Sequence, residues 1–205
     1  MIAVTGGSRG IGAAIAERVA VDGHAVLIGY RSNEDAASKV AERIRSLGCE
    51  AATARVDITD PKSIEEFLDA GQELGPLTGL VAAAGEVQAV GALVDLDPAD
   101  LKKDLEINLL GAVLTARAAI SRLTRTRGPI VLIGLAAATL GSPGTYVHYA
   151  AASGYCCPRG RALERARCPR HPSQLRRARN HLDGLSPRPS TAGESRCFDS
   201  VGSGR

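Results

Sequence analysis

The sequence contains no apolar run long enough to cross a membrane. A membrane-spanning helix needs about 20 predominantly apolar residues, and polar or charged residues interrupt every apolar segment of this chain before that length. The start at Met1 also lacks the basic stretch and small-residue cleavage site of a secretory signal. We therefore expect a soluble, cytoplasmic protein, and 205 residues are enough for one domain with its own core.

Lysine is missing from the end of the chain, where the composition changes abruptly. Residues 1–153 hold 14 basic and 18 acidic residues, whereas residues 154–205 hold 11 arginines and four acidic residues. Half of the ten prolines and four of the five cysteines also lie in the later segment. We predict one domain over residues 1–153, followed by an irregular Arg/Pro/Cys-rich tail over residues 154–205 that is not a domain.

Residues 1–150 alternate short apolar runs with segments of helical periodicity. The apolar runs predict five strands, at Ile2–Val4, Ala25–Ile28, Ala51–Val56, Leu80–Ala83 and Ile130–Ile133. The periodic segments predict four helices, at Gly12–Asp22, Asn33–Leu47, Pro61–Glu73 and Asp97–Leu123. Asp60-Pro61 and Asp97-Pro98 are typical of an N-cap followed by proline at the first helical position. This alternation predicts an α/β fold, a Rossmann-like, doubly wound parallel sheet with helices on both faces and with its C-terminal strands missing or disordered.

A glycine-rich segment, Thr-Gly-Gly-Ser-Arg-Gly-Ile-Gly over residues 5–12, joins the first strand to the first helix. A loop in this place presents backbone N–H groups and the positive end of a helix dipole to a phosphate. A flexible glycine turn is the alternative, and the strand-loop-helix context disfavours it. The predicted cofactor-binding residues of this segment are Thr5, Gly6, Ser8, Arg9, Gly10, Ile11 and Gly12.

The residues after the second strand indicate which dinucleotide fits. An acidic residue there accepts the ribose hydroxyls of NAD, whereas a cation accommodates the 2′-phosphate of NADP. This chain has Tyr30-Arg31-Ser32 and no acid. Arg31, joined by Arg9 from the glycine loop, offers two guanidinium groups suited to phosphate. We predict NADP rather than NAD, the alternative being two solvated surface arginines.

The TGxxxGxG spacing of residues 5–12 resembles the classical short-chain dehydrogenase/reductase family, including 3-oxoacyl-acyl-carrier-protein reductases and glucose dehydrogenases. The resemblance implies that Asp57 and Ile58, after the third strand, contact adenine. Ala84 and Gly85 stand where the family has the end of an Asn-Asn-Ala-Gly stretch, so only their backbone role carries over. The family moves a hydride between nicotinamide and a carbonyl or alcohol carbon, while a tyrosine hydroxyl handles the proton.

The resemblance assigns the catalytic roles to Tyr149, as proton donor or acceptor, and to Asn108, in a long helix. Two partners of the family's catalytic set are replaced. Gly134-Leu135 stands at the serine position, and Ser153 stands at the lysine position four residues after Tyr149. Without the lysine, the tyrosine should keep a pKa near its ordinary value of about 10. We therefore expect an impaired enzyme, or alternatively a catalytically inactive NADP-binding protein.

The tail is compatible with a shifted reading frame. Codons allowed for residues 170–182, read one base later, can encode Gly-Ile-Arg-Val-Asn-Ser-Val-Ala-Pro-Gly-Ile-Ile, which resembles the family's sixth strand and the Pro-Gly turn after it. We hypothesise a frameshift near residues 152–154, which the nucleotide sequence of the gene can test. The chain would then lack the sixth and seventh strands and leave the fifth strand as an exposed edge.

Two other readings of the tail are weaker. An arginine-rich nucleic-acid arm would need aromatic stacking platforms, and the tail has only Tyr155 and Phe198. A metal site would use a set of cysteines and a histidine whose spacing contains no CxxC pair, namely Cys156, Cys157, Cys168, His171 and Cys197. We therefore predict no metal, nucleic-acid or membrane partner, but a small carbonyl or alcohol substrate. Intact relatives of this type would form homo-oligomers, an assembly that is doubtful for this chain.

Overall fold

The computed structural model describes residues 1–134, apart from the side chain of Leu93. Five strands alternate with helices along this part of the chain. The strands are β1 (Ile2–Thr5), β2 (Val26–Tyr30), β3 (Ala51–Arg55), β4 (Gly79–Ala82) and β5 (Ile130–Leu132). The helices are α1 (Gly10–Val21), α2 (Glu34–Ser46), α3 (Pro61–Ala70), α4 (Pro98–Leu105) and α5 (Ala112–Thr126), with short helical turns η1 (Gln72–Leu74), η2 (Leu93–Asp95) and η3 (Glu106–Gly111).

The five strands form one parallel sheet in the order β3-β2-β1-β4-β5. The chain builds outward from β1 through β2 to β3, and then returns to pair β4 with the other side of β1. This reversal makes the carboxyl ends of β1 and β4 a topological switch point, where open α/β sheets bind their ligands. The predicted doubly wound fold is confirmed.

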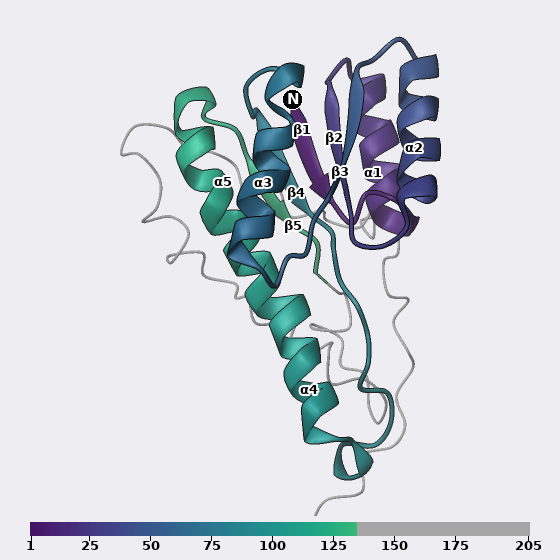
Figure 1. Ribbon diagram of the computed structural model, residues 1–205, viewed down its shortest axis with the longest axis vertical. Coiled ribbons are helices and arrows are strands. Elements are labelled where there is room, and N and C mark those ends of the chain that lie inside the picture. The colour runs from purple at the N-terminus through teal and green to yellow at the C-terminus, as the bar shows by residue number, and fades with distance from the viewer. Residues whose placement is uncertain (135–205) are drawn as a thin grey trace, which may run out of the picture. The chain divides into compact units, whose positions relative to one another are not determined.

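Helices cover both faces of the sheet, with α1 and α2 on one face and α3 and α5 on the other (Figure 1). Successive strand residues point to opposite faces, so neighbours such as Ala3 and Val4 are buried in different cores. Among the largest buried side chains, Phe67 and Leu80 pack on the α3/α5 side, and Ile28 and Ile44 on the α1/α2 side. The central strands β1, β2 and β4 are therefore buried on both faces, as the continuous apolar runs predict.

Two predicted helix starts are confirmed at the level of single hydrogen bonds. The Asp60 carboxylate accepts from the Lys62 amide at 3.0 Å, and the Asp97 carboxylate accepts from the Ala99 amide at 2.8 Å. A proline follows each aspartate at the first helical position, where its missing N–H costs nothing. Residues 97–123, predicted as one helix, instead contain α4, the wider π-helical turn η3 and α5, which follow one another along one long helix (Figure 1).

Strand β5 is the outer strand on one side of the sheet formed by residues 1–134, and it pairs only with β4 there. The predicted domain boundary at residue 153, the frameshift and the tail lie outside the described residues. Within the described part of the chain, none of the helices has the length and apolar character needed to cross a membrane.

An ion-pair network joins α5 to α3, the two helices that cover one face of the sheet. Arg122 donates to the Glu65 carboxylate through Nη1 and to Asp69 Oδ1 through Nη2, the latter at 2.6 Å. Only a quarter of the Arg122 side chain is exposed. The hydrogen bond from Arg122 lowers the pKa of Asp69 against the opposing effect of partial burial.

We expect Arg122→Met to lower the free energy of unfolding by about 1 kcal/mol at pH 7. Because the pKa of Asp69 is lower in the folded state, its contribution is complete above the unfolded value of about 3.9 and is lost as the pH falls through the folded pKa. The difference between wild type and variant in urea titrations should therefore hold from pH 7 to about pH 4 and shrink as the pH falls below that value. Arg18→Met, which removes an exposed helical ion pair, is the control, and an equal loss in both variants would contradict the network's role.

Candidate functional site

The glycine loop between β1 and α1 is packed tightly against the end of β4. Gly6 has φ +68°, and a Cβ there would lie 2.7 Å from the Cα of Ala84. A Cβ on Gly12 would lie 2.2 Å from the carbonyl oxygen of Gly6. Both distances are too short for any side chain, so the loop needs glycine at these positions. The contacted atoms belong to the backbone, so the path of the loop depends on glycine at these two positions.

The outer side of the same loop has room for a ligand. Gly10 has φ +55°, and within residues 1–134 no heavy atom lies within 4 Å of a Cβ built on it, its chain neighbours and the backbone of its own helix aside. Gly10 begins α1, whose first-turn amides have no acceptor within the helix, and the N-cap residue Arg9 provides no side-chain hydrogen bond to them. The first turn contains no acidic residue, and Ile11 is 65% exposed. This donor set fits an anion such as a diphosphate.

Thr5, at the start of the glycine loop, connects the loop to the segment after β4 by hydrogen bonds. Its side chain is 1% exposed, and its hydroxyl accepts a long hydrogen bond, 3.4 Å, from the amide of Ala84. The amide of Ala83 donates to the Thr5 carbonyl at 3.2 Å. These contacts tie the ends of β1 and β4 together, where the family's asparagines are replaced by alanine. Of the predicted binding residues, buried Thr5 and half-buried Ala84 thus contact each other, and this contact helps to position the loop.

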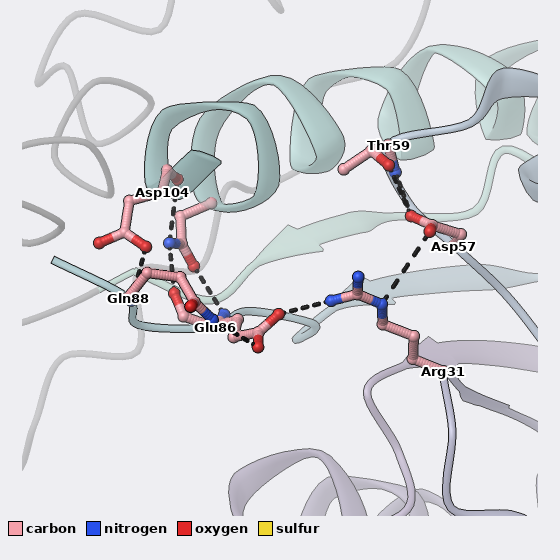
Figure 2. A network of polar contacts seen from close by, with 7 residues as sticks. Arg31, Asp57, Thr59, Glu86, Gln88 and Asp104 are labelled. Carbon is pink, nitrogen blue, oxygen red and sulfur yellow. Dashed lines mark hydrogen bonds and ion pairs between the residues drawn. The ribbon is translucent and has the colours of Figure 1, made fainter. Parts of the chain in front are cut away.

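Three charged side chains meet above the carboxyl ends of β2, β3 and β4. Arg31 extends from the end of β2 between Glu86 and Asp57 (Figure 2). Its Nη1 lies 2.5 Å from Glu86 Oε2, and its Nε lies 3.9 Å from Asp57 Oδ2. About half of the Arg31 side chain is exposed. The structure therefore brings together two predicted cofactor-binding residues, Arg31 and Asp57, and it adds Glu86, which sequence reasoning missed.

Asp57 is held as a carboxylate by its neighbour Thr59. The hydroxyl and the amide of Thr59 both donate to Asp57 Oδ1, at 2.7 Å and 3.0 Å. These hydrogen bonds lower the pKa of Asp57 against the effect of partial burial, and the charges of Arg31 and Arg55 lower it further. Asp57 is thus an anion at neutral pH, with Oδ2 turned toward Arg31 (Figure 2).

Ile58, the second residue predicted to contact adenine, has its side chain in the core. It is 7% exposed, and a Cβ on Gly111 would lie 2.7 Å from its Cδ1. The close approach of Ile58 to Gly111 sets the distance between the end of β3 and the start of α5. Its side chain therefore has a packing role, and its backbone alone could reach a ligand.

The side chain of Asn108 holds the segment that follows β4. Its Oδ1 accepts from the Glu86 amide at 3.1 Å, and its Nδ2 donates to the Glu86 carbonyl at 2.6 Å. The same Nδ2 donates to the Asp104 carbonyl, 3.0 Å away, on the preceding helical turn. Asn108 lies within η3, where the helix widens. The predicted catalytic asparagine thus fixes the backbone beside the glycine loop.

Asp104 is a buried carboxylate that the sequence reasoning did not single out. It is 1% exposed, and its two oxygens accept from the amides of Gln88 and Ala89 at 2.8 Å and 3.1 Å. Asp104 and Asn108 lie four residues apart, so they share one face of the helix. Together they hold residues 86–89 by the main chain.

The other predicted catalytic positions lie outside the described residues. Tyr149, Leu135 and Ser153 all follow residue 134, at which the described part ends just after β5. The roles of these positions stay predictions.

We expect Asp104→Ala to lower the free energy of unfolding by about 2–4 kcal/mol, because two backbone N–H groups would lose their acceptor in a buried place. Urea unfolding of the variant beside Asp100→Ala, an exposed residue of the same helix, measures this. A loss no larger than that of the control would show that the two amides find other acceptors.

Comparisons with known proteins agree with the geometry of the fold and of the glycine loop. A match to the short chain dehydrogenase family covers residues 1–155. The uncharacterized oxidoreductase YgfF of Escherichia coli is 36% identical over 156 residues, which are 74% of this chain and 63% of that protein. The mouse 3-oxoacyl-[acyl-carrier-protein] reductase is 33% identical over 153 residues, again 74% of this chain and 63% of the relative.

Solved structures show the same likeness. A short chain dehydrogenase from Burkholderia cenocepacia, in complex with NADP, superposes with a TM-score of 0.72 at 35% identity, over 80% of this chain and 66% of that one. A dehydrogenase/reductase from Sinorhizobium meliloti superposes with a TM-score of 0.73 at 32% identity, over 80% and 65%.

The chain spans about three fifths of the length of the two curated relatives described above. The match to the family covers residues 1–155, which include the glycine loop at the switch point and Asn108 in the long helix. The chain belongs to the short-chain dehydrogenase/reductase family.

Proposed function

We propose that this chain binds NADP and belongs to an NADP-dependent oxidoreductase that reduces a small carbonyl compound or oxidises the corresponding alcohol. The observation that carries the proposal is the glycine loop, packed on β4 by Gly6 and open at Gly10, with the Arg31 guanidinium at the end of β2. The NADP complex of the Burkholderia cenocepacia dehydrogenase supports this cofactor.

Each part of the dinucleotide would have its own partner. The first-turn amides of α1, starting at Gly10, would hold the diphosphate, and Arg31 with Arg9 would hold the 2′-phosphate. Asp57, ionised and fixed by Thr59, would accept from the adenine amine. The exposed side chain of Ile11 would cover the cofactor's apolar surface. A bound nicotinamide dinucleotide supplies the hydride chemistry that no side chain can provide.

The proton would pass through Tyr149, which the resemblance assigns. Asn108 would act by fixing the main chain of Glu86 beside the site, since its side-chain oxygen and nitrogen already bond to backbone groups. Gly134-Leu135 and Ser153 offer neither the serine hydroxyl nor the lysine cation at their positions. The tyrosine would then lack the nearby cation that lowers its pKa, and turnover would be slow.

A second candidate function is NADP binding without catalysis. The replacement of lysine by Ser153 favours it, because cofactor binding by the glycine loop and Arg31 does not need that position. We further propose a cytoplasmic location and a small carbonyl or alcohol substrate, and we expect homo-oligomers of intact relatives rather than of this chain. The nucleotide sequence of the gene tests the frameshift hypothesis for residues 154–205, because stop codons in the shifted frame would refute it.

We expect NADPH to bind saturably, as followed by the fluorescence of the nicotinamide, and carbonyl reduction to be slow. The lost acid–base partners should reduce turnover at least about a hundredfold relative to the mouse 3-oxoacyl reductase assayed alongside with the same carbonyl substrate. Binding with turnover near that of the relative would contradict the impaired site. No binding of either NADPH or NADH would refute the proposed function itself.

A further inference from the structure

The Arg31–Glu86 ion pair crosses the sheet edge at which the cofactor is proposed to bind. Arg31 follows β2 and Glu86 follows β4, and these two strands flank β1. The contact at 2.5 Å therefore bridges the carboxyl end of β1, from which the glycine loop starts. It lies at the topological switch point of the sheet.

We propose that Glu86 sets the cofactor preference of this site, because its carboxylate competes with the 2′-phosphate of NADP for the Arg31 guanidinium. This inference rests on the proposed function and goes beyond it. The usual sequence criterion considers only the residues after β2, where this chain has a cation and no acid. In the structure, the Glu86 carboxylate, from the segment that follows β4, contacts the Arg31 guanidinium.

The charges around Arg31 support the competition. One guanidinium is shared by two carboxylates, since Glu86 contacts Nη1 and Asp57 lies 3.9 Å from Nε. The three side chains carry one net negative charge when both acids are ionised, and Arg55, whose Nε donates to the Arg31 carbonyl at 3.1 Å, adds one positive charge beside them. A phosphate that approaches Arg31 must therefore displace Glu86 or accept repulsion from it. The ribose hydroxyl of NAD carries no charge and can leave the pair in place.

Glu86 cannot simply move away with its backbone. The Glu86 amide and carbonyl are both bonded to the side chain of Asn108, and the next residues are held by Asp104. Its side chain also accepts from Gln88 Nε2 at 2.7 Å through the other carboxylate oxygen. The carboxylate is thus kept near Arg31, and it still acts on a phosphate bound there.

Glu86→Gln tests the inference in the full-length chain. The substitution keeps the size of the side chain and an oxygen that can accept from Gln88, and it removes the charge. We expect the ratio of the NADH and NADPH dissociation constants to rise about two- to tenfold in favour of NADPH, measured by nicotinamide fluorescence or calorimetry at low salt. The effect should fall as salt screens the charges.

Two further variants make the result specific. Glu17→Gln removes the carboxylate of another exposed ion pair, with Arg43, away from the strand ends, and should leave the ratio unchanged. In an Arg31→Met background, Glu86→Gln should change the ratio much less, because the shared guanidinium is gone. Circular dichroism and thermal unfolding confirm that each variant is folded.

An unchanged or lower preference for NADPH in Glu86→Gln, with both dinucleotides still bound, would overturn the role of Glu86 and leave the proposed function standing. An equal rise in the Arg31→Met background, or an equal rise in Glu17→Gln, would also overturn it, since the effect would not pass through Arg31. Failure of wild type and variant to bind either dinucleotide would refute the proposed function, and with it this inference.

Discussion

The close backbone contact between the glycine loop and the end of β4 is the constraint on which the site depends. Gly6 approaches Ala84 so closely that a methyl group would overlap main-chain atoms, and Gly12 approaches the Gly6 carbonyl in the same way. These contacts set the angle at which α1 leaves β1, and they therefore direct the first-turn amides. The parallel pairing of β1 with β2 and β4, and of β2 with β3, then brings Arg31, Asp57 and Glu86 to the same edge.

A second constraint comes from the long helix on the other face. The widening at η3 lets Asn108 reach two groups at once: the main chain of Glu86, and the Asp104 carbonyl of its own helix. Asp104, one turn earlier, supplies a buried carboxylate for two further amides. Three amides and one carbonyl of a connection that has no regular secondary structure are thus satisfied by two side chains of one helix face. This arrangement places a rigid segment beside the glycine loop.

Much of this fold could be predicted from local sequence signals. The alternation of apolar runs and helical periods gives five strands and their order of appearance, and the Asp-Pro pairs give two helix starts to the residue. The π-helical turn could not be predicted, because one extra residue per turn hardly disturbs the apolar periodicity around Asn108. Glu86 and Asp104 could not be assigned either. Their roles depend on partners 55 and 15–16 residues away in sequence, which only the sheet order and the helix packing bring together.

The hydrogen bonds that Asn108 and Asp104 form with residues 86–89 all involve main-chain atoms of this segment. Asn108 and Asp104 bond to the amides and carbonyl of this segment, groups that every non-proline residue provides. The shape of the segment is therefore largely independent of which side chains it carries. A change of charge at its first position, Glu86, would therefore leave the main-chain hydrogen bonds of the segment in place. Side-chain charge and main-chain position are thus separate properties of this one residue.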